Sequence, residues 1–112
     1  MARLSTHVLD TARGMPAANL TIDLEAFSAA SRRRLETLTT GADGRASGPE
    51  LDGGVYELIF HAGDYFRAAG IALTEPPFLD HVVVRFGIAA GDHRYHVPLL
   101  LSPYGYSTYR GS

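Results

Sequence analysis

The sequence predicts an all-β fold, a sandwich of packed sheets that carries one short helix. Three observations lead to this prediction. Apolar and polar residues alternate along most of the chain, which is the pattern of half-buried strands. Turns rich in glycine, proline and aspartate separate these stretches at short intervals. Only one short stretch breaks the alternation in a way that favours a helix.

Each strand is predicted from its own pattern. The stretch 19–25 alternates strictly, so Leu20, Ile22 and Leu24 are expected on a buried face. The stretch 95–101 alternates in the same way, with Tyr95 at the start of its core face. In chain order, the expected strands are 4–10, 19–25, 34–40, 55–60, 82–88, 95–101 and 104–109.

The helix is expected over 64–69, before the strand that starts near residue 82. Asp64 is a residue type that caps a first helical turn. Gly70 follows and suits a left-handed exit from the helix.

Length and composition limit the classes of function. A chain of 112 residues suits one domain, which we expect to span 1–112. A net charge of -2 gives no electrostatic reason to expect nucleic acid or a membrane as partner. There is no cysteine, so disulfides and thiolate chemistry are excluded. No signal-peptide or membrane-spanning stretch is recognisable, and a cytoplasmic protein is expected.

The outward face of 95–101 suggests self-association. If Tyr95 and its alternates fill the core, then His96, Pro98 and Leu100 face outward. Proline and leucine are unsuited to a face bathed in water, so a partner surface is expected there. A second copy of the chain is the simplest partner, and polar groups on this face would then lie in a cleft between subunits.

Two histidines and one arginine are candidates for chemistry. His7 shares a strand face with Ser5 and Leu9, and His96 lies on the outward face described above. A partly desolvated histidine stays neutral and can act as a general base or a metal ligand. Arg45 follows a tight Asp-Gly turn that could present its guanidinium to an anionic or carbonyl-rich ligand. For each of the three, a purely structural or solvated role is the alternative.

The final tetrapeptide 109–112, Tyr-Arg-Gly-Ser, places a phenol, a guanidinium and a hydroxyl at one end of the last strand. A polar strand tip is the plain alternative. A serine-nucleophile elbow is absent. Zinc bound by His7, His96 and a carboxylate is a weak alternative, because no local ligand spacing supports it.

Several segments together resemble one known family. These are Leu-Ser-Thr-His-Val-Leu-Asp-Thr at 4–11, Gly-Met-Pro-Ala at 14–17, Asp-Gly-Arg at 43–45, Tyr-His-Val-Pro-Leu-Leu-Leu-Ser-Pro at 95–103 and the terminal tetrapeptide. The chain resembles the transthyretin-like 5-hydroxyisourate hydrolases from end to end. The resemblance implies a sandwich of two four-stranded sheets with a short helix.

The resemblance also implies a reaction and its residues. The implied substrate is 5-hydroxyisourate, a product of urate oxidation, which is hydrolysed to 2-oxo-4-hydroxy-4-carboxy-5-ureidoimidazoline without metal or cofactor. The implied assembly is a homotetramer, a dimer of dimers with active sites at the subunit interface. The implied catalytic residues are His7, Arg45 and His96. The implied substrate-binding residues are Tyr109, Arg110 and Ser112.

Two other functions fit the same scaffold. One is a carrier of a hydrophobic hormone, as in transthyretin, whose channel would be apolar. The other is an adhesion-type sandwich with no pocket. Fold alone does not separate these from a hydrolase, and the site residues favour the hydrolase.

Overall fold

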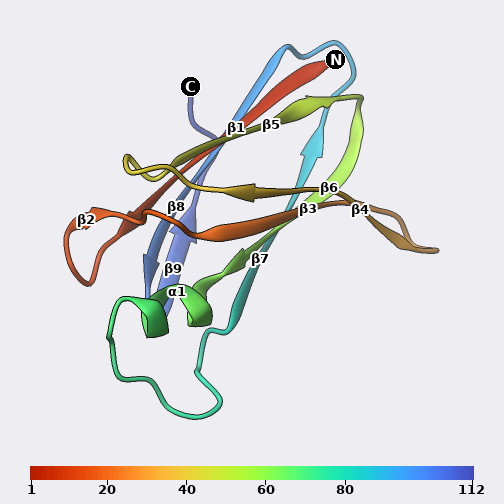
Figure 1. Cartoon of the computed structure of the whole chain (residues 1–112). Coiled ribbons are helices and arrows are strands. Elements are labelled where there is room, and N and C mark those ends of the chain that lie inside the picture. The colour runs from red at the N-terminus through yellow and green to blue at the C-terminus, as the bar shows by residue number, and fades with distance from the viewer.

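The computed structural model describes residues 1–112 as two packed layers of strands with one short helix at one end (Figure 1). In chain order the elements are β1 (Ala2–Asp10), β2 (Met15–Pro16), β3 (Thr21–Phe27), β4 (Arg32–Thr39), β5 (Arg45–Leu51), β6 (Gly54–His61), α1 (Ala62–Ala68), β7 (His81–Ile88), β8 (Arg94–Ser102) and β9 (Gly105–Thr108). The predicted all-β class is confirmed. No helix is both long and apolar enough to cross a bilayer.

The first sheet has the order β2-β1-β8-β9, and β5 also pairs with β1. β5 and β2 share one edge of β1, because β5 pairs with 2–7 and β2 with Leu9 and Asp10. Five strands therefore build this sheet, one more than predicted, but it is at most four strands wide because β5 and β2 follow one another along the same edge. β1 and β8 run parallel, whereas the other pairs are antiparallel.

The second sheet has the order β4-β3-β6-β7 and is antiparallel throughout. The predicted core face of β3 is confirmed, since Leu20, just before the strand, and Ile22 and Leu24 within it are fully buried. One cluster of 22 buried apolar residues joins the two layers. Burial of this core is the main stabilising contribution, because apolar surface removed from water contributes roughly 25 cal/mol per Å².

Two strands were not predicted as strands. β2 is only two residues long, too short to show a pattern. β5 contains Gly48 and Pro49, which disrupt the apolar alternation. Pro49 is tolerated because β5 pairs only with β1 and is an edge strand.

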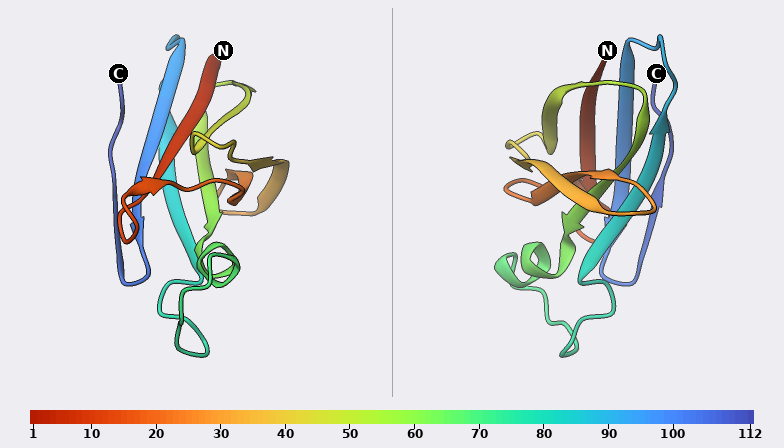
Figure 2. Two further views of the ribbon diagram at one scale, coloured as in Figure 1. Left: turned by 60° about the vertical axis from the view of Figure 1, so that its left-hand side comes forward. Right: turned by 90° about the vertical axis from the view of Figure 1, so that its right-hand side faces the viewer.

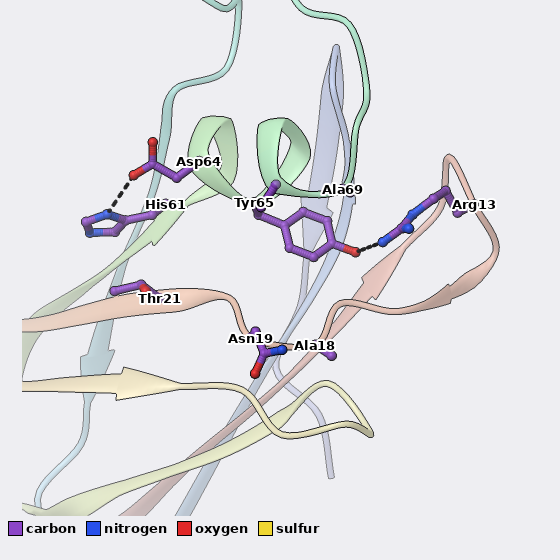
Figure 3. A pocket seen from close by; sticks show the side chains of 9 residues that line it. Arg13, Ala18, Asn19, Thr21, His61, Asp64, Tyr65 and Ala69 are labelled. Atoms are coloured by element: carbon purple, nitrogen blue, oxygen red, sulfur yellow. Dashed lines mark hydrogen bonds and ion pairs between the residues drawn. The ribbon is translucent and has the colours of Figure 1, made fainter.

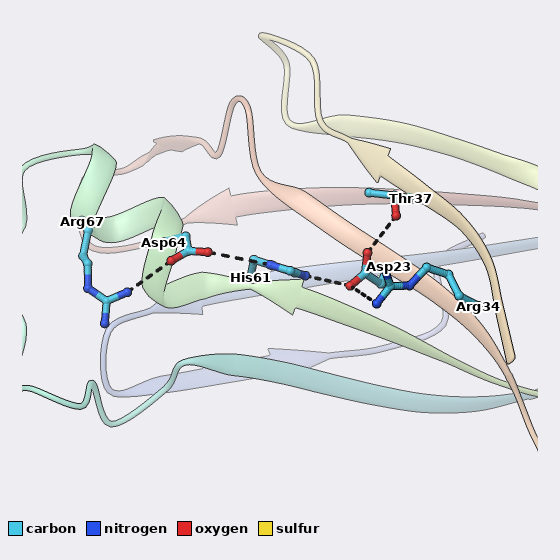
Figure 4. A network of polar contacts seen from close by, with 6 residues as sticks. All are labelled: Asp23, Arg34, Thr37, His61, Asp64 and Arg67. Atoms are coloured by element: carbon cyan, nitrogen blue, oxygen red, sulfur yellow. Dashed lines mark hydrogen bonds and ion pairs between the residues drawn. The ribbon is translucent and has the colours of Figure 1, made fainter. Parts of the chain in front are cut away.

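The second sheet carries charged residues on its outer face. Asp23 is only 6% exposed and binds Nε2 of His61 at 2.9 Å, Oγ1 of Thr37 at 2.9 Å and a guanidinium nitrogen of Arg34 at 3.3 Å (Figure 4). Burial would raise the pKa of Asp23, but the hydrogen bonds from His61 and Thr37 hold it below its ordinary value. These contacts give His61 a structural role.

Helix α1 lies at the end of the molecule opposite both termini (Figures 1 and 2). The expected capping by Asp64 is wrong, because the helix starts at Ala62 and Asp64 falls inside its first turn. An acidic residue there still interacts favourably with the helix dipole. Gly70 has φ +80° just after the helix, as predicted.

Candidate active site

Strand register brings the predicted histidines and arginine to one outer face of the first sheet. His7 on β1 pairs with Arg45 on β5 on one side and with Pro98 on β8 on the other. Ser5, two residues earlier on the same face of β1, pairs with His96 of β8. Three strands that are distant in sequence therefore place these side chains next to one another.

The turn before β5 explains the position of Arg45. Gly44 has φ +77°, and its carbonyl accepts a hydrogen bond from the Val8 amide at 2.8 Å. An ideal Cβ at position 44 would lie 2.5 Å from the Val8 carbonyl oxygen, so only glycine permits this approach. The turn thus docks against β1 and starts β5 with Arg45 opposite His7.

His96 is half-buried, and its Nδ1 lies 2.8 Å from the hydroxyl oxygen of Ser5. Burial of the ring lowers the pKa of His96, and the positive charges of Arg45 and His7 lower it further. The neighbouring Ser5 acts in the opposite direction without reversing the shift in the pKa. His96 is therefore neutral near neutral pH and can accept a proton.

A cavity of about 250 Å³ opens on this face. It is lined by Ser5, Thr6, Arg45, Ala46, Ser47, Arg94, His96 and Ser112. Ala46 is the one apolar residue among them, so the cavity suits a small ligand with many polar groups. His7 is not one of the lining residues, but it occupies the next outward position of β1 after Ser5.

The terminal segment reaches this cavity by pairing with β8. After β9, residues 109–112 run beside β8 toward the end that holds the N-terminus (Figure 2). The Gly111 amide donates to the His96 carbonyl at 2.8 Å, and Ser112 lines the cavity. Of the tetrapeptide, Ser112 is thus placed together with His96 and Arg45.

Arg110 and Tyr109 point elsewhere within this chain. The Arg110 guanidinium lies 4.0 Å from the centre of the Tyr95 ring, and one of its nitrogens lies 3.7 Å from a carboxylate oxygen of Asp92. Tyr109 lines a separate hollow beside Tyr95 and Phe86. The cavity around His96 therefore does not contain the side chains of Arg110 and Tyr109.

The outward face of β8 differs in one respect from the prediction. Pro98 is buried within the single chain, because β1 and β9 flank it and Thr108 donates to its carbonyl at 2.7 Å. Leu100 and its partner Leu9 are each 36% exposed on this face. The apolar outer strip is narrower than predicted, but it is present next to the histidines.

A second cavity, of about 450 Å³, lies between α1 and the β1–β2 loop (Figure 3). Behind it Asp10, which is fully buried, accepts hydrogen bonds from Arg13 Nε at 2.9 Å and from the Tyr65 hydroxyl at 2.8 Å. Arg13 also donates to the Tyr65 hydroxyl at 2.8 Å. These three side chains satisfy one another's hydrogen-bonding groups, so they have a structural role. We call the contact of Asp10, Arg13 and Tyr65, which links β1 to the helix, the joint.

This contact between Asp10, Arg13 and Tyr65 was not predicted from the sequence. The sequence did contain a sign of this contact, because Asp10 lies on the same inward-facing side of the strand as Thr6 and Val8. A carboxylate at such a position needs buried partners. Residues 1–112 contain no cluster of three or more histidine, aspartate or glutamate side chains that could hold a metal ion.

Comparisons with known proteins agree with this architecture. The model of the HIUase/Transthyretin family matches residues 4–111. The 5-hydroxyisourate hydrolase 2 of Rhizobium meliloti (strain 1021) is 59% identical over 115 residues, which cover 98% of this chain and 96% of that protein.

Two solved structures have closely similar folds. The 5-hydroxyisourate hydrolase of Klebsiella pneumoniae superposes with a TM-score of 0.83 at 36% identity, with 100% of each chain covered. (S)-allantoin synthase superposes with a TM-score of 0.90 at 41% identity over 99% of this chain. The match covers 44% of that second protein, so this chain spans less than half of its length. The chain belongs to the HIUase/Transthyretin family.

Proposed function

We propose that this chain hydrolyses 5-hydroxyisourate to 2-oxo-4-hydroxy-4-carboxy-5-ureidoimidazoline in urate degradation. Relatives that match over 93% or more of their length bear the name of this enzyme. The observation that carries the proposal is the register of β1, β5 and β8, which places His7, Arg45 and His96 on one outer sheet face. The small polar cavity beside them suits a ligand rich in carbonyl and N–H groups.

Each of the proposed catalytic groups has its own role in the hydrolysis of a ring amide. Water adds its oxygen to the carbonyl carbon, the C–N bond breaks, and the leaving nitrogen gains a proton. His96 is neutral near neutral pH and would take the proton from water. His7 would take part, together with His96, in the transfer of a proton to the leaving nitrogen. Arg45 would stabilise the negative charge that develops on the carbonyl oxygen.

The proposed substrate-binding residues are Tyr109, Arg110 and Ser112. Ser112 lines the same cavity as His96, which supports a direct contact with substrate. Tyr109 is 59% exposed, and Arg110 is largely exposed as well. We infer that a neighbouring subunit covers this region and completes the binding site.

The proposed assembly is a homotetramer, a dimer of dimers. Leu9 and Leu100 form an exposed apolar pair beside the histidines, and Met15 is 44% exposed near the same end of β1. Covering these side chains would remove apolar surface from water and enclose the cavity between subunits. The domain limits 1–112 and a cytoplasmic location also stay predictions.

A hydrophobic carrier is the alternative on the same scaffold. A carrier needs an apolar channel, whereas Ala46 is the one apolar residue in the lining of this cavity. Two arginines, Arg45 and Arg94, would be desolvated by an apolar ligand at a high free-energy cost. The composition of the cavity therefore favours the hydrolase.

The test follows freshly generated 5-hydroxyisourate by its ultraviolet absorbance, with and without the protein. Acceleration of the decay supports the proposal, and an unchanged decay rate refutes it. A parallel reaction in a metal chelator should proceed at the same rate, since the proposed site needs no metal. Loss of rate in chelator would refute the metal-free mechanism.

A further inference from the structure

The imidazole of His96 is held on one side by Ser5. The Ser5 hydroxyl oxygen lies 2.8 Å from Nδ1, and the two residues are direct partners across β1 and β8. Both residues are half-buried and both line the cavity. A hydrogen bond between two rigid strands holds a ring more firmly than a contact from a mobile loop.

The terminal segment holds the ring from another side. An ideal Cβ at position 111 would lie 2.5 Å from Cδ2 of His96 and 3.2 Å from Cγ. The Gly111 backbone is therefore packed directly against the ring, and the amide of Gly111 bonds to the His96 carbonyl. With Nδ1 engaged by Ser5, Nε2 is the ring nitrogen left for water or substrate.

The position of the ring proton decides what Nε2 can do. A serine hydroxyl can donate or accept, so the contact with Nδ1 alone allows either tautomer. Because Ser5 occupies Nδ1, a base that acts in the cavity needs its lone pair on Nε2. The ring proton then lies on Nδ1, and the Ser5 hydroxyl accepts the hydrogen bond.

We propose that Ser5 is a positioning residue that keeps the neutral His96 ring protonated on Nδ1, so that Nε2 presents its lone pair to the cavity. The orientation of the ring is a property of the protein alone. The tautomer and its kinetic consequence rest on the proposed hydrolase function. In that reaction Nε2 accepts the proton of the attacking water, and Ser5 itself touches no reacting atom.

The first experiment measures the tautomer by the nitrogen chemical shifts of the His96 side chain in uniformly labelled protein at neutral pH. Wild type should show a protonated Nδ1 and an unprotonated Nε2. Ser5→Ala should move the ring toward the Nε2-protonated form. Ser47→Ala is the matched control, because Ser47 lies opposite Ser5 on β5 and lines the same cavity without a hydrogen bond to His96. It should leave the His96 shifts as in wild type.

The second experiment measures kcat and KM for 5-hydroxyisourate. Ser5→Ala should lower kcat by about tenfold or more and leave KM within about twofold, because the variant misorients a proton acceptor and leaves the proposed substrate-binding residues unchanged. Ser5→Thr keeps the hydroxyl and suits a strand, so it should restore most of kcat. Where Ser5→Ala does not fold, Ser5→Cys keeps nearly the same volume with a much weaker hydrogen-bonding group and should show the same loss.

Three outcomes would overturn the inference: an Nε2-protonated His96 in wild type, an unchanged tautomer in Ser5→Ala, or an unchanged kcat in an active Ser5→Ala protein. Failure of the hydrolase proposal looks different. In that case wild type does not accelerate the decay of 5-hydroxyisourate, while the nitrogen shifts still decide whether Ser5 holds the tautomer.

Discussion

Gly111 packs so closely against His96 that a methyl group at position 111 would overlap the imidazole ring, with 2.5 Å between the added carbon and Cδ2. The lack of space beside the ring thus explains why position 111 of the terminal tetrapeptide is a glycine. It lets the last residues pair with β8 and brings Ser112 to the cavity.

Gly111→Ala should therefore lower kcat/KM by about tenfold or more, because the ring or the terminal segment must move. Core packing is remote from this contact, so the melting temperature should change little. Gly105→Ala is the matched control, since a Cβ there meets only the Ser102 hydroxyl at 3.8 Å, an ordinary contact. Equal activity of the two variants would contradict the steric reason given for Gly111.

Removal of the positive charge of Arg45 should change the pH dependence of the reaction. Arg45 and His7 both lower the pKa of His96, in addition to the effect of burial. In Arg45→Gln the protonated imidazole is less disfavoured, so the pKa of His96 rises. The acid limb of the kcat/KM profile should then move to higher pH, because His96 must be neutral to accept a proton.

The same substitution should also reduce the rate at the pH optimum by roughly 10²- to 10³-fold, if the guanidinium stabilises the oxyanion. A matched control is Arg33→Gln, which removes an arginine from β4 in the other sheet. An acid limb that stays in place in Arg45→Gln would contradict the electrostatic coupling between Arg45 and His96.

Substitution of either candidate catalytic histidine should lower the rate while the fold and the assembly are kept. His7→Ala and His96→Ala each remove a half-buried outward-facing side chain, so little core packing is lost. General acid–base groups contribute typically about 10²- to 10⁴-fold, and losses in that range are expected in kcat. His93→Ala, at an exposed turn position, is the control. Wild-type rates in either His7→Ala or His96→Ala would refute the role assigned to that residue.

Local patterns were sufficient to predict most strands and the candidate residues, but not how the residues meet. The alternation in β3 and β8 correctly predicted which side chains fill the core. The pairing of His7 with Arg45, by contrast, depends on the register of β1 and β5, which are separated in the chain by β2, β3 and β4. No local pattern encodes that register, and only the resemblance to a family put these residues in one site.

The buried polar groups were the other features that sequence reasoning missed. Glu57 is 2% exposed because Arg32 and Arg85 both bind its carboxylate, at 3.1 and 3.0 Å. In the sequence, Glu57 simply occupies an outward position of a strand, where exposure is expected. Its burial depends on Arg85 from the adjacent strand β7 and on Arg32 from β4, which lies one strand further away beyond β3, so predicting it again requires knowledge of strand order.

The joint formed by Asp10, Arg13 and Tyr65 should stabilise the fold without affecting catalysis. Tyr65→Phe removes a buried hydroxyl that bonds both other residues, so the free energy of unfolding should fall by about 1–2 kcal/mol. Chemical denaturation measures this loss. Tyr104→Phe removes an exposed hydroxyl and serves as control. An unchanged stability in Tyr65→Phe would show that the joint is not a stabilising contact.

The same joint predicts a pH dependence of stability. Burial would raise the pKa of Asp10, but hydrogen bonds from Arg13 and Tyr65 hold it below its ordinary value. A carboxyl whose folded-state pKa is lowered contributes stability above its unfolded pKa of about 3.9, and this contribution is lost as the pH falls through the folded-state pKa. Without the Tyr65 hydroxyl the pKa of Asp10 rises, so acid unfolding of Tyr65→Phe should start at higher pH.

Deletion of residues 109–112 should separate catalysis from folding. None of the four residues belongs to the buried core, and their backbone contact with β8 is the single bridge between Gly111 and His96. The truncated chain should keep its circular dichroism spectrum, but lose most of its activity because the cavity loses Ser112 and the His96 ring loses the backbone packed against it. Ser112→Ala isolates the hydroxyl, and a smaller loss in this variant would assign the remainder to residues 109–111. Full activity in the truncated chain would remove the tetrapeptide from the proposed site.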